Sequence, residues 1–289
     1  MVNILLILFC ISLSATQQHT PIVLLHGITS NKNELTSVEK WLKSRLPNPV
    51  HNIEIGNGRR TSIFQTMESQ TNELCSTIYA IPELENGFHF IGMSQGGLLA
   101  RSYVQRCNRF PVKNLITWVS PHAGVYGFND VHFDWDKVYT PFYQRMYSFA
   151  GYWKDPCQYH TYLENSTFLP YLNNESPYLS RYPSMGFDFH KNRERIISLE
   201  NFVMVWSKND DVITPPQSGK FEFYDIKCGT PLTVQNFFNS SQYLEDLLGL
   251  RTLYDSGGLY MLETNCTHSG HKTVDCFQQL EYLTFPFLL

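Results

Sequence analysis

The stretch FHFIGMSQGGLLAR, from Phe88 to Arg101, decides how this sequence is interpreted. It begins with an apolar run, turns at GMSQG (residues 92–96), and continues with leucine-rich residues of helical character. A serine between a strand and a helix, flanked by glycines, occupies a strained turn in which larger neighbours do not fit. The stretch therefore predicts that the Ser94 hydroxyl stands clear of the sheet as a nucleophile. A purely structural turn is the alternative.

Short apolar strands and periodic helices alternate on both sides of this turn. Strands are expected at 21–25, 53–55, 88–91, 115–119, 202–206 and 259–262, and helices at 33–46, 66–81, 96–107, 240–250 and 275–287. This alternation is typical of an α/β fold with a mostly parallel central sheet and helices on both faces. In that setting, G-x-S-x-G is the nucleophile elbow of the α/β-hydrolase fold.

The alternation stops between about residues 121 and 200, where aromatic residues, proline and asparagine are frequent and strand patterns are absent. Because loops longer than about 15 residues are uncommon in compact domains, we expect an inserted, lid-like, partly helical segment over the sheet edge. A separate small domain is the alternative. We expect the aromatic residues to form an apolar groove, unless they only fill the core. The chain from 16 to 289 is otherwise expected to be one α/β-hydrolase domain.

The first 15 residues are expected to be a signal peptide. A continuous apolar run covers residues 4–11, and small residues suited to cleavage follow near residues 14–16. The run is shorter than the roughly 20 residues that span a bilayer, and no other segment is apolar enough to cross one. An uncleaved anchor is the alternative. The sequence therefore predicts entry into the secretory pathway.

Two residue types fit the oxidising environment of that pathway. Cys10 falls in the expected signal peptide, and the other six cysteines are an even set that suggests three disulfides: Cys75, Cys107, Cys157, Cys228, Cys266 and Cys276. Sequons for N-glycosylation occur at Asn165, Asn174, Asn239 and Asn265. No CxxC pair is present, so a cysteine-based zinc site is not expected. We predict no metal and no cofactor.

Composition and charge restrict the class of partner. The chain has 289 residues, of which 43% are hydrophobic and 15% aromatic, and its formal net charge is -4. These values fit a globular protein with a substantial core. Because the sequence contains no run of lysine or arginine, nucleic acid is not an expected partner.

A nucleophilic serine needs a histidine base and a carboxylate that orients it, and in this fold the chain order is serine, acid, histidine. The acid is expected in the turn after the strand at 202–206, where Asp210 and Asp211 both fit. Two histidines follow that turn, His268 and His271. We favour His271, because it follows a glycine and lies closer to the last helix.

The developing oxyanion needs two backbone N–H donors. One is expected from Gln95, the residue after the serine, and the other from Ile28, in the loop after the first strand. His26 comes too early in the chain to act as the base. We expect it to be a structural residue of that loop.

Several longer strings resemble the palmitoyl-protein thioesterases, a family of lysosomal or secreted α/β-hydrolases. The resemblance covers nearly the whole mature chain. It rests on PIVLLHGI (21–28), GMSQGGLLAR (92–101), QRC (105–107), WVSPHAGVYG (118–127), YWKDP (152–156), YLENSTFLPYLNNE (162–175) and NDDVITPPQSGKFEFY (209–224). The glutamine after the serine, YWKDP and the FLPYLNNE part of the sixth string are far more specific than G-x-S-x-G.

The resemblance implies a set of roles. It selects Asp210 over Asp211, because the family's catalytic aspartate lies five residues before a proline, here Pro215. The other implied roles are a nucleophile, a base, two oxyanion donors and a disulfide: Ser94, His271, Ile28, Gln95 and Cys75–Cys107.

The implied activity is hydrolysis of long-chain fatty acyl thioesters, from S-acylated proteins or acyl-CoA, through an acyl-serine in the lysosome. The VITP turn (212–215) resembles the second branch of the family, which favours other acyl lengths and is poor on acylated proteins. A secreted lipase or carboxylesterase would use the same triad on oxygen esters. A non-catalytic binding protein of this fold would lack a triad member, and here each has a candidate.

Overall fold

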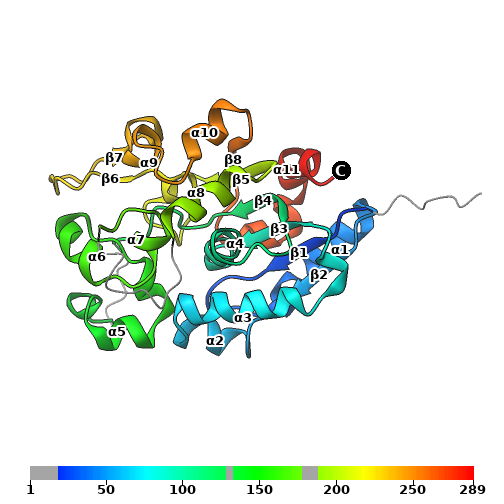
Figure 1. The fold of residues 1–289 in the computed structure, drawn as a ribbon, viewed down its shortest axis with the longest axis horizontal. Coiled ribbons are helices and arrows are strands. Elements are labelled where there is room, and N and C mark those ends of the chain that lie inside the picture. Colours follow the sequence, from blue (N-terminus) through cyan, green and yellow to red (C-terminus); the bar gives the residue numbers. More distant parts are fainter. Residues whose placement is uncertain (1–18, 128–132, 178–187) are drawn as a thin grey trace, which may run out of the picture.

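The computed structural model describes residues 19–127, 133–177 and 188–289 (Figure 1). The expected signal peptide at residues 1–15, with Cys10, lies outside the described residues. Within the described part of the chain, no helix is both long and apolar enough to cross a membrane.

The core of the fold is a six-stranded sheet in the order β2-β1-β3-β4-β5-β8. Its strands are β1 (Ile22–Leu25), β2 (Val50–Ile53), β3 (Phe88–Met93), β4 (Val112–Trp118), β5 (Asn201–Ser207) and β8 (Leu259–Thr264). All neighbouring strands are parallel. The runs of Val, Ile, Leu and Phe in the four inner strands are buried on both faces, as a parallel sheet covered by helices requires. The edge strands β2 and β8 are partly exposed. The predicted α/β-hydrolase fold with a mostly parallel sheet is therefore confirmed.

Helices cover both faces of this sheet (Figure 1). The α-helices of the described chain are α1 (Thr36–Arg45), α2 (Arg59–Phe64), α3 (Met67–Tyr79), α4 (Gln95–Arg106), α5 (Pro141–Met146), α6 (Tyr159–Asn165), α7 (Leu169–Leu172), α8 (Phe189–Ile197), α9 (Ser241–Leu244), α10 (Leu250–Asp255) and α11 (Val274–Thr284). One face packs against α1 and α11, whose Trp41 and Phe277 rings stack with centroids 4.4 Å apart. The other face packs against α3, α4 and α8.

Two predicted elements differ from the structure. The second strand lies at Val50–Ile53 rather than 53–55, in register with β1. The helix expected at 240–250 ends early, at Leu244 of α9, and a second short helix, α10, begins at Leu250. The chain breaks between them because Asp246 adopts a φ of 52° and its carboxylate caps α10 by accepting from the Arg251 and Thr252 amides. Sequence reasoning also missed α2 and a small antiparallel pair, β6 (Phe223–Tyr224) with β7 (Val234–Gln235).

The segment between β4 and β5 forms short helices that pack onto the sheet layer. Its Phe168 and Leu169 belong to the same hydrophobic cluster as the strand residues Val23 and Phe90. Polar bonds join it to α4 as well. The Arg101 guanidinium donates to Asn173 Oδ1 at 2.8 Å. Burial lowers the pKa of Arg101 to about 9.

All six cysteines that were predicted to pair form disulfides, which confirms that expectation. Cys75–Cys107 joins α3 to the end of α4, Cys157–Cys228 joins the β4–β5 insertion to the loop after β6, and Cys266–Cys276 closes the loop before α11. The third disulfide encloses both candidate histidines. It therefore restricts where either ring can lie.

The glycines of the elbow allow α4 to pack directly on the end of β1. A Cβ on Gly96 would lie 2.4 Å from the His26 carbonyl oxygen and 2.5 Å from that of Leu25. A Cβ on Gly92 would lie 2.5 Å from the Gly96 carbonyl oxygen. These neighbours are backbone atoms and cannot rotate away. The close contact between the backbones of α4 and β1 at the elbow therefore requires glycine.

We expect Gly96→Ala to lower the free energy of unfolding by about 3 kcal/mol or more, because overpacking against fixed backbone costs roughly 1–3 kcal/mol even where side chains can yield. Gly229→Ala is the matched control, since the nearest atom to its Cβ lies 3.7 Å away. Urea denaturation of both variants measures the difference. Equal midpoints would contradict a tight contact between α4 and β1.

Candidate active site

Ser94 lies at the turn between β3 and α4, at the carboxyl edge of the sheet. Its φ of 55° and ψ of -128° place a non-glycine residue in a strained conformation, as the sequence predicts for a nucleophile elbow. Its amide is fixed by a 2.8 Å hydrogen bond to the Trp118 carbonyl. The loop after β1 lies directly against it, since a Cβ on Gly27 would come within 2.9 Å of Ser94 Cβ.

Asp210 and His268 form a buried pair in the loops after β5 and β8. His268 Nδ1 lies 2.9 Å from Asp210 Oδ2 and 3.0 Å from Oδ1. The Asp210 carboxylate also accepts from the amides of Val212 at 2.9 Å and Ile213 at 2.8 Å. These contacts fix the carboxylate, which in turn orients the imidazole so that Nε2 is the nitrogen left for other partners.

Asp211 contacts the same histidine from another direction. Its Oδ1 accepts from the His268 backbone amide at 3.1 Å. Sequence reasoning treated the two aspartates as alternatives for one role. In the structure Asp210 binds the His268 ring and Asp211 binds its backbone, so both position this residue.

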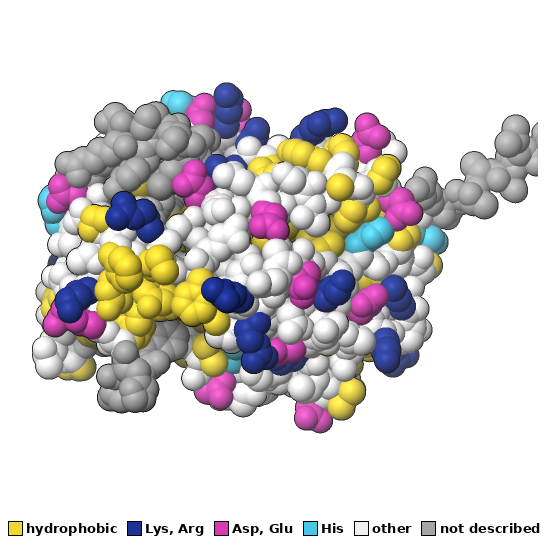
Figure 2. Space-filling view, turned by 90° about the horizontal axis from the view of Figure 1, so that it is seen from below, with side chains coloured by type: hydrophobic (Ala, Val, Ile, Leu, Met, Phe, Trp, Pro, Cys, Tyr) yellow, Lys and Arg dark blue, Asp and Glu magenta, His cyan; other side chains and the backbone are white. Residues whose placement is uncertain are grey.

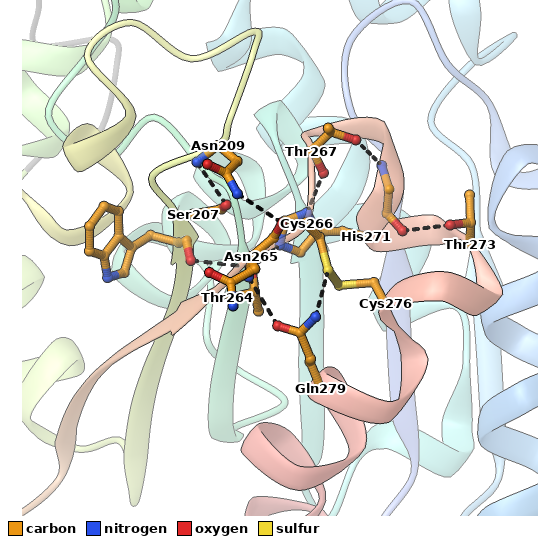
Figure 3. The surroundings of a disulfide bond; sticks show 12 residues. Ser207, Asn209, Thr264, Asn265, Cys266, Thr267, His271, Thr273, Cys276 and Gln279 are labelled. Carbon is orange, nitrogen blue, oxygen red and sulfur yellow. Dashed lines mark hydrogen bonds between the residues drawn. A yellow bond between two sulfur atoms is a disulfide. The ribbon is translucent and has the colours of Figure 1, made fainter.

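The preference for His271 as the base needs correction. His271 is fully buried, with Nε2 2.8 Å from Thr264 Oγ1 and Nδ1 2.8 Å from the Thr267 carbonyl (Figure 3). Burial lowers its pKa. Both ring nitrogens of His271 therefore already have a hydrogen-bond partner, and neither partner is Asp210. The structure brings His268, the second choice, into the place expected for His271.

The two backbone amides predicted to bind an oxyanion lie next to Ser94. Gln95 is the first residue of α4, where helix geometry provides no acceptor for its N–H. Ile28 follows Gly27 in the β1 loop and lines a cavity together with Ser94. No described residue accepts a hydrogen bond from either amide. Both donors are therefore available to a ligand atom at the serine.

The Gln95 side chain joins α4 to α2 and to the β4–β5 insertion. Its Nε2 donates to the Ser62 carbonyl at 2.9 Å, and its Oε1 accepts from Ser148 Oγ at 2.9 Å and Tyr152 OH at 3.0 Å. Burial raises the pKa of Tyr152, which keeps the phenol neutral and able to donate. A glutamine is needed here because it both donates and accepts, a role that sequence reasoning did not assign.

An apolar cavity of about 310 Å³ opens beside Ser94. Aromatic side chains from the β4–β5 insertion form one wall: Phe133, Trp135, Phe149, Tyr152 and Trp153. Its volume is at the lower end of ordinary ligand sites, which run from about 300 to 1,000 Å³. Some aromatic residues of the insertion therefore line a cavity at the serine. Others, such as Phe168, are part of the hydrophobic core.

A second, smaller cavity of about 150 Å³ lies on another side of Ser94. It shares Ser94 and Ile28 with the apolar cavity, but His268 and an ion pair between Lys272 and Glu34 complete its lining. Lys272 is the first cause of the lowered pKa of Glu34. An apolar, aromatic cavity and a smaller cavity of mixed lining, which includes charged side chains, therefore meet at the serine.

His26, set aside as structural, lies near this site but outside it. Its Nδ1 is 2.9 Å from the Gly27 carbonyl, and burial lowers its pKa.

Among the described residues, no group of three or more His, Cys, Asp or Glu side chains is placed to hold a metal ion.

The four sequons occupy different environments. Asn239 and Asn265 are exposed and Asn165 is half-buried, but Asn174 is buried. The Asn174 amide nitrogen, to which a glycan would be attached, donates to the carbonyls of Leu247 at 2.7 Å and Phe189 at 3.2 Å. The structure therefore does not support Asn174 as a glycosylation site in the folded chain.

The roles of the two histidines can be separated with a fluorophosphonate probe that labels an activated serine. We expect His268→Ala to slow labelling of Ser94 by about 100-fold or more, the typical contribution of a general base. We expect His271→Gln to label at close to the wild-type rate but to lose about 1–3 kcal/mol of stability, because it disturbs two buried hydrogen bonds. Loss of labelling in a folded His271→Gln, with normal labelling of His268→Ala, would reverse the assignment.

The sequence of the whole chain is similar to that of several known proteins. The chain is 39% identical to palmitoyl-protein thioesterase 3 of Dictyostelium discoideum, covering 98% of this chain and 97% of the relative. It is 32% identical to palmitoyl-protein thioesterase 1 of Caenorhabditis elegans, over 88% of each chain. It is 30% identical to the lysosomal thioesterase PPT2 homolog of Drosophila melanogaster, over 98% of this chain and 96% of the relative.

Solved structures and a family model were also compared. An extracellular α/β-hydrolase from a Paenibacillus species aligns with a TM-score of 0.46 and 14% identity, covering 91% of this chain and 96% of that one. The family model described as palmitoyl protein thioesterase matches residues 21–268, from just before β1 to His268. The chain therefore belongs to the palmitoyl protein thioesterase family.

Proposed function

We propose that this thioesterase hydrolyses long-chain fatty acyl thioesters through an acyl-enzyme on Ser94, with His268 as the base and Asp210 as its orienting acid. The observation that carries the proposal is that Ser94 lies where an apolar, aromatic cavity meets a smaller cavity whose lining includes His268 and the Lys272–Glu34 ion pair. The buried contact between His268 and Asp210 supports the assignment of the base.

In the first half-reaction, Ser94 Oγ attacks the thioester carbonyl carbon and its proton passes to His268 Nε2. The carbonyl oxygen becomes an oxyanion, which the Ile28 and Gln95 amides stabilise by about 2.7–4 kcal/mol per donor. When the tetrahedral intermediate collapses, the carbon–sulfur bond breaks. The sulfur leaves readily as a thiolate, because a thiol has a pKa of about 8.5. The thiolate then takes the proton from His268, which leaves as part of the free thiol and returns His268 to its neutral form.

In the second half-reaction, water attacks the acyl-serine and gives its proton to His268. The carbon–oxygen bond to Ser94 breaks, and His268 returns that proton to Ser94 Oγ. The oxyanion forms at the same two amides as before. One base and one pair of donors therefore serve both halves of the cycle.

The two cavities suit the two ends of such a substrate. The apolar cavity, lined by rings such as Trp135 and Trp153, would bind the acyl chain, because burial of apolar chain against rings is favourable. The smaller cavity would hold the thiol carrier near the charged side chains of Lys272 and Glu34. We propose an S-acylated protein or acyl-CoA as that carrier.

We also propose that the protein acts in the lysosome or is secreted. Relatives in Drosophila melanogaster and Xenopus laevis are named lysosomal thioesterases. The three disulfides fit an oxidising compartment. Within that pathway we propose glycosylation at the three accessible sequons, Asn165, Asn239 and Asn265.

A lipase or carboxylesterase would use the same residues, so the leaving group must be tested. We expect kcat/KM for palmitoyl-CoA to exceed that for an oxygen ester of the same acyl group and a similar carrier by at least about tenfold, or ~1.4 kcal/mol. Steady-state assays of both compounds measure this ratio, with Ser94→Ala as the inactive control. Equal or faster turnover of the oxygen ester would contradict the proposal.

A further inference from the structure

Exposed apolar side chains gather on one face of the molecule, over α2 and α5 (Figure 2). Phe64 ends α2 and is 49% exposed, and Phe142 and Met146 on α5 are 58% and 40% exposed. Phe142 and Met146 are four residues apart, so they lie on the same side of the helix. We call Phe64, Phe142 and Met146 the α2–α5 patch. Contiguous apolar surface of this kind usually marks an interaction site.

The α2–α5 patch is continuous with the apolar cavity at Ser94. Phe64 contacts Tyr147 with ring centroids 5.9 Å apart, and Tyr147 contacts Phe133 at 5.5 Å. From α5, Phe142 contacts Tyr143 at 5.8 Å, and Tyr143 contacts Phe133 at 4.9 Å. Phe133 lines the apolar cavity together with Ser94. Two series of ring contacts therefore run from the surface to the cavity.

The helices that carry the α2–α5 patch are positively charged. α2 has the sequence RRTSIF and α5 has the sequence PFYQRM, so they contain three arginines and no acidic residue. These arginines, Arg59, Arg60 and Arg145, are exposed, and Arg59 is paired with Glu34 at 3.0 Å. Apolar and aromatic side chains bordered by arginine are characteristic of protein faces that lie on the headgroup region of a bilayer.

We propose that the α2–α5 patch docks this thioesterase on a lipid surface that contains anionic headgroups. Phe64, Phe142 and Met146 enter the boundary between headgroups and acyl chains, and Arg60 and Arg145 pair with lipid phosphates. A membrane-held acyl chain then passes along the aromatic contacts to the cavity. This last step rests on the proposed function, whereas docking itself does not.

Docking is tested by co-sedimentation with vesicles of phosphatidylcholine containing phosphatidylserine, and with vesicles of phosphatidylcholine alone. The test variant is Phe142→Ser/Met146→Ser. The matched control is Val274→Ser/Tyr282→Ser, which removes residues of α11 that are 74% and 83% exposed but lie outside the patch. We expect the wild type and the control to bind the anionic vesicles, and the test variant to bind at least about tenfold more weakly. Binding to the neutral vesicles should be weaker for all three.

A second measurement separates docking from catalysis. We expect the test variant to hydrolyse butyryl-CoA in solution at the wild-type rate, and a palmitoylated peptide held in the same vesicles at least about tenfold more slowly. Vesicle binding by the wild type with no hydrolysis of any thioester would support docking and refute the proposed function.

Three results would overturn the docking proposal. They are failure of the wild type to bind vesicles, equal loss of binding in the test and control variants, and a wild-type dimer that Phe142→Ser/Met146→Ser converts to a monomer. The last result, measured by sedimentation equilibrium, would show that a second copy of the chain covers the patch.

Discussion

The site depends on how closely α4 approaches the carboxyl end of β1. Gly96 has no side chain, so its backbone packs against the carbonyls of Leu25 and His26. That contact brings the β1 loop, with Gly27 and Ile28, against Ser94. A site with two backbone donors and a strained serine therefore results from one short approach between a helix and a strand.

The insertion and the nucleophile helix share polar contacts as well as a hydrophobic core. Gln95 receives hydrogen bonds from Ser148 and Tyr152, and Tyr152 lines the apolar cavity. Midway along the same helix, Arg101 binds Asn173 of the insertion. Because buried polar groups are costly unless paired, these contacts fix the cavity wall relative to the serine.

Much of this arrangement follows from the sequence. The apolar runs predict a parallel sheet, and the chain order of the fold places a serine, a turn with two aspartates and a loop with two histidines at one edge. The choice between His268 and His271 could not be made from spacing. A short helical turn (Ser269–Lys272) directs His271 inward to Thr264, and no feature of CTHSGHK indicates which ring faces the cavity. Likewise, the break between α9 and α10 depends on the side chain of Asp246 capping a new helix, which apolar periodicity does not reveal.

The central claim is that Ser94 carries the acyl group during turnover. The most direct measurement is rapid acid quenching of the protein with palmitoyl-CoA, followed by mass spectrometry of the proteolytic peptides. The account predicts a palmitoyl adduct on the peptide that contains Ser94, which forms before product accumulates and is absent in Ser94→Ala. Product formation with no adduct at any quench time, or a kinetically competent adduct on another residue, would contradict it.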